Sequence, residues 1–252
     1  MTDKNIQKPI VLSIAGFDPS GGAGLLADIK TIENNGCYAM AVCTANTLQT
    51  DVYFKDCYWV DATVVLKQLQ LLLDRFNIAA VKIGIIENLT LLEQLLKVLK
   101  AYKKELPIVL DPVLKSSSGH SFQGEKLLFS ADILKNISLI TPNYEEIFQL
   151  SNASSLSEKI TRLQQFTSVL LKGGHHPSEK GKDTLYLKDK TVFNFFPSEE
   201  KIYEKHGSGC ILSSAITSYL AQGKSLANAC EDAKRYTEKA LQSNPTKLAY
   251  HS

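Results

Sequence analysis

A short cysteine-bearing motif, Gly207-Ser208-Gly209-Cys210, stands where a predicted helix begins. Glycines at the start of a helix leave backbone N–H groups that point at one place, which is a natural binding site for an anion. The helix dipole favours a thiolate at that position, so we expect the pKa of Cys210 to be lowered. A buried structural cysteine is the alternative interpretation. The motif therefore predicts an anion site beside an ionisable sulfur.

A second glycine-rich segment, residues 16–24 (GFDPSGGAG), lies between the first predicted strand and the first predicted helix. It contains Gly22-x-Gly24-x-x-Ala27, which formally matches the dinucleotide-binding fingerprint. That fingerprint also needs an acidic residue at the end of the second strand, where this chain has Asn46-Thr47-Leu48-Gln49. No Gly-Lys-Ser/Thr follows, so the segment is not a Walker A loop. Its glycine content exceeds what a turn needs and indicates a small ligand lying against the backbone.

Polar residues follow three successive predicted strands. Asp111 follows one strand, Asn143 and Glu146 follow the next, and Lys172 follows a third. Taken singly, Asp111 fits a cap and Lys172 a solvated surface position. The carboxyl ends of parallel strands meet at one edge of a sheet, which brings carboxylates close to a lysine. Mg²⁺ prefers carboxylate and phosphate oxygens, and lysine is a common phosphate contact. Together with the anion site, these residues indicate phosphoryl transfer.

Short apolar runs alternate with amphipathic stretches, the pattern of strands joined by helices. This alternation predicts a mostly parallel sheet with right-handed crossovers and helices on both faces. The predicted strands are residues 9–15, 39–45, 79–83, 107–110, 138–140 and 168–171. The predicted helices are residues 23–34, 61–76 (capped by Asp61), 89–103, 125–134, 210–220 and 226–241.

Two segments break the alternation and predict small antiparallel hairpins. One covers residues 52–60 and turns at Lys55-Asp56, and the other covers residues 184–196 and turns at Lys188-Asp189. The first hairpin carries four aromatic residues that we expect to be exposed and to form a dimer contact: Tyr53, Phe54, Tyr58 and Trp59. With no linker or internal repeat, residues 1–252 are predicted to form a single α/β domain.

The composition restricts the class of protein. The 252 residues carry a formal charge of +2, which argues against a nucleic-acid binder driven by bulk electrostatics. No apolar run approaches the roughly 18 residues of a membrane span, and residues 1–9 lack the apolar core of an export signal. The five cysteines are scattered with no C-x-x-C pair, which argues against a disulfide scaffold and the common zinc spacings. We expect a cytoplasmic protein, and His206 is expected to be a loop or hydrogen-bonding residue.

Six ordered motifs, together with Gln49, resemble the hydroxymethylpyrimidine/phosphomethylpyrimidine kinases of thiamine synthesis. The motifs span nearly the whole chain: residues 16–31, Lys82-Ile83-Gly84, Leu110-Asp111-Pro112-Val113, Ile140-Thr141-Pro142-Asn143, Lys172-Gly173-Gly174-His175 and His206 to Cys210. The resemblance implies a ribokinase-like α/β fold. It also implies phosphorylation of a pyrimidine alcohol, and then of its monophosphate, with ATP and Mg²⁺ as cofactors.

The resemblance also implies roles for individual residues. Gln49 is the pyrimidine-binding amide, and an amide can both donate to a ring nitrogen and accept from an exocyclic amine. Further substrate-binding residues are Gly16, Ala23, Asp28, Ile85 and Val113. Lys172 and Asn143 bind ATP, and Asp111 and Glu146 hold the metal. Gly207, Ser208 and Gly209 cradle the transferring phosphoryl group, and Cys210 is the base, where sugar kinases have an aspartate.

Two other functions compete with this interpretation. Some pyridoxal kinases share the glycine-rich signature and the cysteine, but those that look like this chain tend to lose the amide of Gln49. A non-catalytic nucleotide sensor could use the same loops, but Asp111, Lys172 and Cys210 argue against it. One departure from the family pattern is Lys205, which precedes His206 where the family has threonine.

Overall fold

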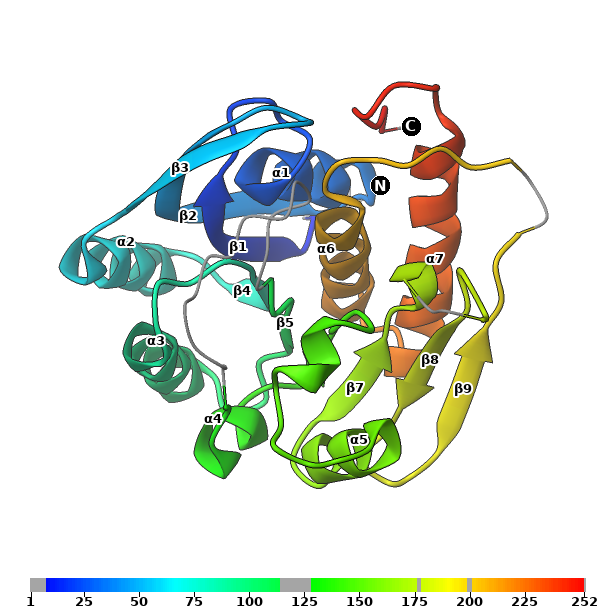
Figure 1. The fold of residues 1–252 in the computed structure, drawn as a ribbon. Coiled ribbons are helices and arrows are strands. Elements are labelled where there is room, and N and C mark those ends of the chain that lie inside the picture. Colours follow the sequence, from blue (N-terminus) through cyan, green and yellow to red (C-terminus); the bar gives the residue numbers. More distant parts are fainter. Residues whose placement is uncertain (1–7, 114–127, 176–177, 199–200, 252) are drawn as a thin grey trace, which may run out of the picture.

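The structure is a computed structural model that describes residues 8–113, 128–175, 178–198 and 201–251. Within these residues, nine strands form one sheet. The strand order is β3-β2-β1-β4-β5-β6-β7-β8-β9 (Figure 1). The six neighbouring strands β2, β1, β4, β5, β6 and β7 run parallel. Strand β3 at one edge, and β8 and β9 at the other, are antiparallel to their neighbours. The bounds are β1 (Ile10–Phe17), β2 (Tyr38–Gln49), β3 (Phe54–Trp59), β4 (Ile78–Ile83), β5 (Ile108–Leu110), β6 (Leu139–Ile140), β7 (Ser168–Leu171), β8 (Asp183–Tyr186) and β9 (Val192–Phe195).

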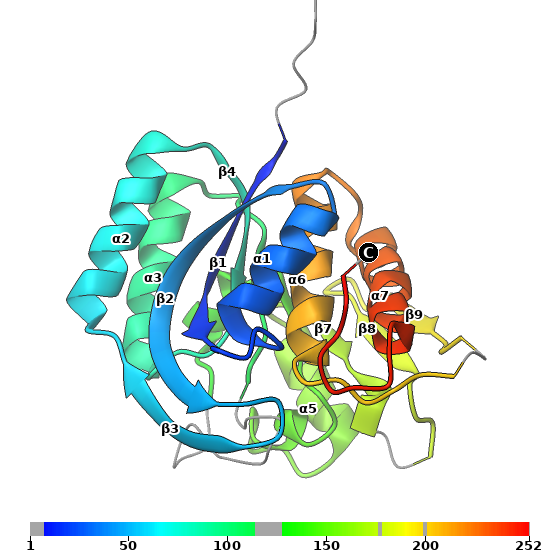
Figure 2. The same cartoon turned by 90° about the horizontal axis from the view of Figure 1, so that it is seen from above.

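Helices cover both faces of this sheet (Figure 2). One face carries α1 (Gly24–Asn34), α6 (Ser208–Ala221) and α7 (Leu226–Gln242). The other carries α2 (Ala62–Arg75), α3 (Leu89–Tyr102), α4 (Ala131–Lys135) and α5 (Leu156–Gln164). Buried strand residues alternate between the two faces, so that Val109, Leu139 and Leu170 pack with α6 and α7, and their neighbours Ile108 and Ile140 pack with the opposite layer. Within the described ranges, no helix is both long and apolar enough to cross a membrane.

The predicted fold class is confirmed, and most elements lie where the sequence places them. Strand β7 has the predicted bounds, and the hairpin of β8 and β9 turns through Lys188 and Asp189 as expected. Asp61 caps α2 by accepting a hydrogen bond from Thr63 N at 2.8 Å. Caps of this kind satisfy backbone N–H groups that the first helical turn leaves unpaired.

The predicted turn at Lys55-Asp56 is wrong, because both residues lie inside β3. Strand β2 continues to Gln49, and its last residues pair with β3. The turn lies at residues 50–53, where Thr50 N donates to Tyr53 O at 2.7 Å. The Thr50 hydroxyl also accepts from Tyr53 N at 3.2 Å, a side-chain turn that competes with strand pairing.

Two helices also differ from the sequence interpretation. The helix predicted over residues 125–134 begins only at Ala131, with Ser130 as its cap, and residues 125–127 lie outside the described residues. Helix α5 was not predicted. Its signals are Leu156, Ile160 and Leu163 at helical spacing and the Ser155/Glu158 capping box that the structure forms.

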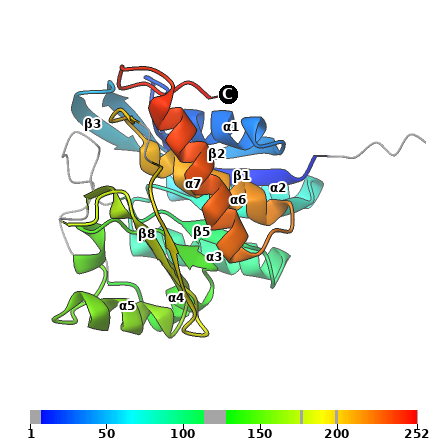
Figure 3. The ribbon, with the colours of Figure 1, turned by 90° about the vertical axis from the view of Figure 1, so that its right-hand side faces the viewer.

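The strand order places a ligand crevice next to β1. The order reverses there, since β2 lies on one side of β1 and β4 on the other, and such switch points open a crevice beyond the carboxyl ends of the strands. The carboxyl ends of β1, β4, β5, β6 and β7 meet at this edge. After α7 the chain turns back toward α1 (Figure 3), where His251 Nδ1 lies 3.5 Å from Thr31 Oγ1. The fold therefore gathers the glycine-rich segment, the start of α6 and the C-terminal residues at one place.

Candidate active site

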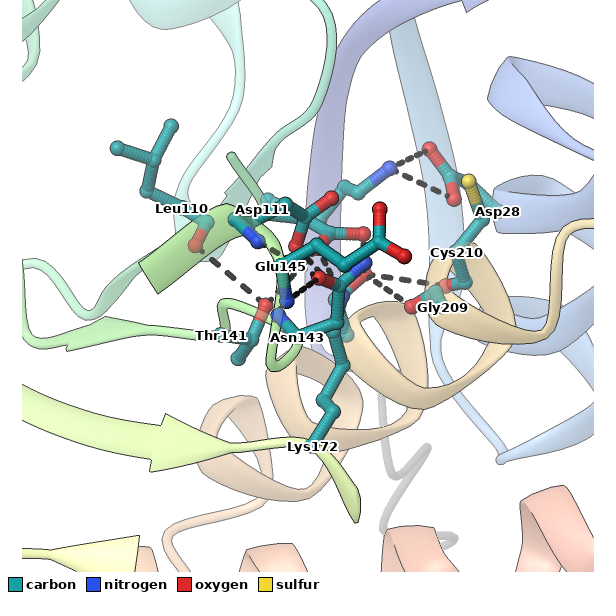
Figure 4. A network of polar contacts seen from close by, with 12 residues as sticks. Asp28, Leu110, Asp111, Thr141, Asn143, Glu145, Lys172, Gly209 and Cys210 are labelled. Atoms are coloured by element: carbon teal, nitrogen blue, oxygen red, sulfur yellow. Dashed lines mark hydrogen bonds and ion pairs between the residues drawn. The ribbon is translucent and has the colours of Figure 1, made fainter. Parts of the chain in front are cut away.

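A buried ion pair forms the centre of the site. Lys172 Nζ, just after β7, lies 2.8 Å from Asp111 Oδ1, just after β5 (Figure 4). The same ammonium lies 3.7 Å from Glu146 Oε2, which follows β6. Thr141 Oγ1 donates to Asp111 Oδ1 at 3.1 Å, and Ser213 Oγ of α6 donates to Asp111 Oδ2 at 3.3 Å. The structure thus brings together the lysine and the carboxylates that the strand ends predicted.

The pKa values in this cluster are set by burial and by mutual charge. Burial raises the pKa of Glu146 to about 6, against the opposing effect of Lys172. Burial acts in the same direction on Asp111, but the ammonium groups of Lys172 and Lys82 outweigh it and lower the pKa of Asp111. For Lys172, burial disfavours the charge, yet the two carboxylates raise its pKa. Lys172 and Asp111 are therefore a cation and an anion at neutral pH.

The start of α6 lies directly against this ion pair. Gly207 precedes the helix with a φ of 75°, and a Cβ added there would lie 2.1 Å from Gly22 O. A Cβ added at Gly209 would lie 3.3 Å from Lys172 Nζ and 3.6 Å from Asp111 Oδ2. At Gly207 only glycine lets the backbone approach so closely, and Gly209 brings the helix start within van der Waals range of the ion pair. The helix start with its unpaired N–H groups and the Lys172 ammonium therefore converge, as an anion site requires.

The predicted lowering of the Cys210 pKa is wrong. Burial raises the pKa of the Cys210 thiol to about 11. The charge of Lys82 opposes this rise, the carboxylates of Asp28 and Asp111 add to it, and the N–H of Gly24 opposes it. The effect of a helix start is modest, whereas loss of solvation and two nearby carboxylates act strongly on a thiolate. In the ligand-free protein the sulfur of Cys210 carries its proton at neutral pH.

Asp18 organises the glycine-rich segment and was not singled out from the sequence. Its Oδ1 accepts from Ser20 N, and its Oδ2 accepts from Ala23 N, both at 2.9 Å. His206 Nε2 lies 2.8 Å from the same Oδ2, which confirms His206 as a hydrogen-bonding residue. The Asp-Pro-Ser-Gly turn signal could have identified this role. The contact ties the glycine-rich segment to the residues just before α6.

The C-terminal residues also contact the segment just before α6. Lys205 is buried, and its Nζ donates to Asn244 Oδ1 at 3.0 Å and to Thr246 O at 2.7 Å, and also to Asn244 O. His206 N donates to Lys247 O at 2.8 Å. Lys205, the departure from the family pattern, thus holds the end of the chain against the start of α6.

The residues predicted to line the substrate pocket lie around the crevice. A Cβ added at Gly16 would lie 2.3 Å from Ile85 Cδ1, so these two residues are in contact. Gln49 is half-buried at the end of β2, and its Nε2 donates to Thr47 Oγ1 at 2.9 Å. Val113 lines a small cavity of about 20 Å³ that also borders Gly84. Ala23 lies at the start of α1, in the segment held by Asp18.

The structure places Asp28 differently from the prediction that it contacts substrate. Its side chain is 0% exposed, and Lys82 Nζ lies 2.7 and 3.0 Å from its two oxygens. Ser13 Oγ and Ser214 Oγ donate to the same carboxylate at 2.6 and 2.7 Å. The sequence signal for this pair is a lysine inside the otherwise apolar run of β4.

The carboxylates suit a magnesium ion. Among the described residues, no three His, Cys, Asp or Glu side chains cluster closely enough to form a metal site by themselves. Mg²⁺ commonly takes one or two protein carboxylates and completes its shell with substrate phosphates and water. Asp111 and Glu146, hard oxygen donors beside the anion site, fit that pattern.

A parallel sheet with a switch point in its strand order and a lysine–carboxylate pair beside a helix start are features expected of a small-molecule kinase. Residues 18–251 match the family model described as phosphomethylpyrimidine kinase. A hydroxymethylpyrimidine/phosphomethylpyrimidine kinase of Aquifex aeolicus is 36% identical over 245 residues, covering 93% of this chain and 95% of that protein. The chain belongs to the phosphomethylpyrimidine kinase family.

Solved structures confirm the ribokinase-like fold. A phosphomethylpyrimidine kinase from Clostridium difficile is 30% identical with a TM-score of 0.74, covering 91% of this chain and 98% of that one. A pyridoxal kinase from Staphylococcus aureus in complex with pyridoxal is 25% identical with a TM-score of 0.81, covering 97% and 93%. Some relatives are longer, and the chain spans 46% of the length of two yeast proteins that it matches.

The raised pKa predicts how Cys210 reacts with iodoacetamide in the ligand-free protein. Only the thiolate reacts, so the alkylation rate should rise about tenfold per pH unit from about pH 7 to about pH 10. Mass spectrometry of the peptide that contains Cys210 measures this rate. The same peptide in urea is the control and should level off above about pH 8.5. A plateau below about pH 9 in the folded protein would contradict the assigned environment.

Proposed function

We propose that this chain transfers a phosphoryl group from ATP to 4-amino-5-hydroxymethyl-2-methylpyrimidine and then a second one to the monophosphate, in thiamine diphosphate biosynthesis. The observation that carries the proposal is the Lys172–Asp111 pair lying against Gly209 at the start of α6. Membership of the phosphomethylpyrimidine kinase family supports the same substrates. ATP is supported by the related Staphylococcus aureus pyridoxal kinase, whose structure in complex with AMP-PCP is known.

The phosphoryl group in transfer is held by backbone and by lysine. The N–H groups of Gly207, Ser208 and Gly209 bind its equatorial oxygens, and Lys172 neutralises their charge. Asn143 forms a parallel bridge with Lys172 and is placed to contact the nucleotide. Asp111 and Glu146 hold Mg²⁺, which neutralises phosphate charge when it is bound.

The pyrimidine ring lies in the crevice beside β1. The amide of Gln49 recognises the ring nitrogen and the exocyclic amine, and Gly16, Ala23, Ile85 and Val113 line the pocket. Because Gly16 has no side chain, the Ile85 side chain packs directly against its backbone. Asp28 acts from behind this pocket through its contacts to Lys82 and α6.

The two phosphorylations make different demands on Cys210. In the first step, the sulfur takes the hydroxyl proton as the substrate oxygen bonds to the γ-phosphorus and the bond to ADP breaks. With the pKa of Cys210 at about 11, only about one sulfur in 10⁴ is ionised at pH 7. In the second step the attacking phosphate oxygen is already an anion, and positioning suffices.

The remaining proposals concern assembly and location. Tyr53 and Tyr58 on the β2–β3 ribbon are 61% and 56% exposed, and we assign this surface to a homodimer contact. Phe54, which was expected to be exposed, is 8% exposed and belongs to the core, and Trp59 is half-buried. Five free cysteines and the use of ATP support a cytoplasmic protein, and we regard residues 1–252 as a single domain.

A pyridoxal kinase is the alternative, because the Staphylococcus aureus pyridoxal kinase has the higher TM-score of the two structures compared. Incubation with Mg²⁺ and ATP, followed by product identification by mass, separates the two functions. We expect hydroxymethylpyrimidine to yield its mono- and diphosphate, and pyridoxal to react at least about tenfold more slowly, since the amide of Gln49 matches the pyrimidine. Efficient turnover of pyridoxal alone would contradict the proposal.

Cys210→Ala should separate the two steps. A general base contributes about 10²–10⁴ in rate, so we expect the alcohol step to fall by about that factor and the phosphate step to stay within a few-fold. Steady-state kinetics on each substrate measures the two effects. Cys57→Ala, a half-buried cysteine on β3, is the matched control and should change neither step. Equal losses in both steps would rule out Cys210 as the base.

A further inference from the structure

The buried pair of Lys82 and Asp28 has no direct part in the phosphoryl transfer described above. Both side chains are 0% exposed, and the ammonium lies 2.7 and 3.0 Å from the two carboxylate oxygens. Removing two charges from water costs free energy even when they are paired. Apolar residues of similar volume often stabilise a protein core as well as a buried ion pair does. A pair of this kind next to a catalytic centre therefore points to a role in that centre.

The Lys82 side chain extends along β4 toward the active-site edge of the sheet. Gly84 directly follows β4, and a Cβ added at Gly84 would lie 3.0 Å from Lys82 Nζ. The ammonium therefore lies level with Gly84, in space that a side chain at that position would take. This places a positive charge at the carboxyl end of β4, beside the crevice.

Asp28 connects this charge to α6. Ser214 Oγ donates to Asp28 Oδ1 at 2.7 Å, and Ser214 follows Cys210 by one helical turn on the same face of α6. The adjacent Ser213 donates to Asp111, the partner of Lys172. Two consecutive serines thus fasten the first turns of α6 to two carboxylates, each paired with a lysine. These contacts hold the first turns of the helix that carries Cys210.

Four charged groups interact electrostatically with the sulfur of Cys210. They are Lys82 from β4, Asp28 from α1, Asp111 after β5 and Lys172 after β7. Burial and the two carboxylates disfavour the thiolate, and the charge of Lys82 is the strongest opposing influence on the pKa of Cys210. Figure 4 shows Asp28 and Cys210 together at one end of the polar network.

We propose that Lys82 and Asp28 are a positioning pair for Cys210. The pair fixes the first turns of α6 through Ser214 and holds a permanent positive charge beside the sulfur. This inference rests on the proposed function only where it concerns the alcohol step. The two members of the pair act on the sulfur with opposite signs. Lys82 favours the thiolate, and Asp28 both anchors Lys82 and disfavours the thiolate.

The test is the rate of Cys210 alkylation by iodoacetamide at about pH 9 in the ligand-free variants, followed by mass spectrometry of the peptide. We expect Lys82→Met to slow alkylation by about tenfold or more, because one pKa unit changes the thiolate fraction tenfold. Asp28→Asn should accelerate it, because the neutral amide removes a negative charge near the sulfur while its oxygen still accepts a hydrogen bond from Lys82. A merely structural pair would change the rate in the same direction in both variants, since loosening exposes the thiol. Changes in the same direction, or below about twofold in both, would overturn the proposal.

The double variant Asp28→Asn/Lys82→Met covers the case in which Lys82→Met alone does not fold, because it leaves no bare buried carboxylate. Alkylation must then be faster in Asp28→Asn than in the double variant, and equal rates would overturn the proposal. Lys159→Met is the matched control. It also removes a buried lysine, but one that is bonded to Phe148 O and Ser151 O near α5, and it should leave the rate unchanged.

Activity provides a second and separate readout. Lys82→Met should reduce the alcohol step more than the phosphate step, as expected for Cys210→Ala. Alkylation needs no substrate, so failure of the proposed pyrimidine activity would leave the alkylation result standing. If the alkylation rate of Cys210 changes in opposite directions in the two variants but no pyrimidine is phosphorylated, the proposed function is rejected and the role of the Lys82–Asp28 pair is retained.

Discussion

The buried ion pair of Lys172 and Asp111 is the interaction on which the rest of the site depends. Its two residues follow β7 and β5, so only the completed parallel sheet brings them to 2.8 Å. Charges in such surroundings are stable only when they are paired and hydrogen-bonded, and Thr141 and Ser213 supply the further bonds to Asp111. The ion pair therefore forms only when the sheet is assembled.

Helix α6 begins directly against this pair, and glycines allow it to do so. A side chain at Gly207 would collide with the backbone at Gly22, and one at Gly24 would lie 2.3 Å from Gly16 O. The glycine-rich segment and the start of α6 therefore pack backbone against backbone. Asp18 with His206 on one side, and Lys205 with the C-terminal residues on the other, lock this arrangement. Ser214 of the same helix also donates a hydrogen bond to Asp28, the partner of Lys82.

Much of this could be predicted from the sequence, because strand ends and helix starts follow local patterns. The alternation of elements placed Asp111, Glu146 and Lys172 at one edge, and the glycines before Cys210 identified the helix start. Properties that arise only on packing could not be predicted. The pKa of Cys210 depends on burial and on Asp28 and Asp111, which are distant in sequence, and the contact of Asp18 with His206 spans 188 residues.

We propose that Lys172 is the cation that contacts the nucleotide phosphates. Calorimetric titration of the Lys172→Ala variant with Mg²⁺ and a non-hydrolysable ATP analogue tests it most directly, with thermal unfolding as a check on folding and Lys159→Met as the control. A charge-assisted phosphate contact contributes about 1.5–3 kcal/mol, so we predict that affinity falls by about tenfold or more in Lys172→Ala and is unchanged in the control. A folded Lys172→Ala variant with the nucleotide affinity of the unaltered protein would exclude Lys172 as that cation.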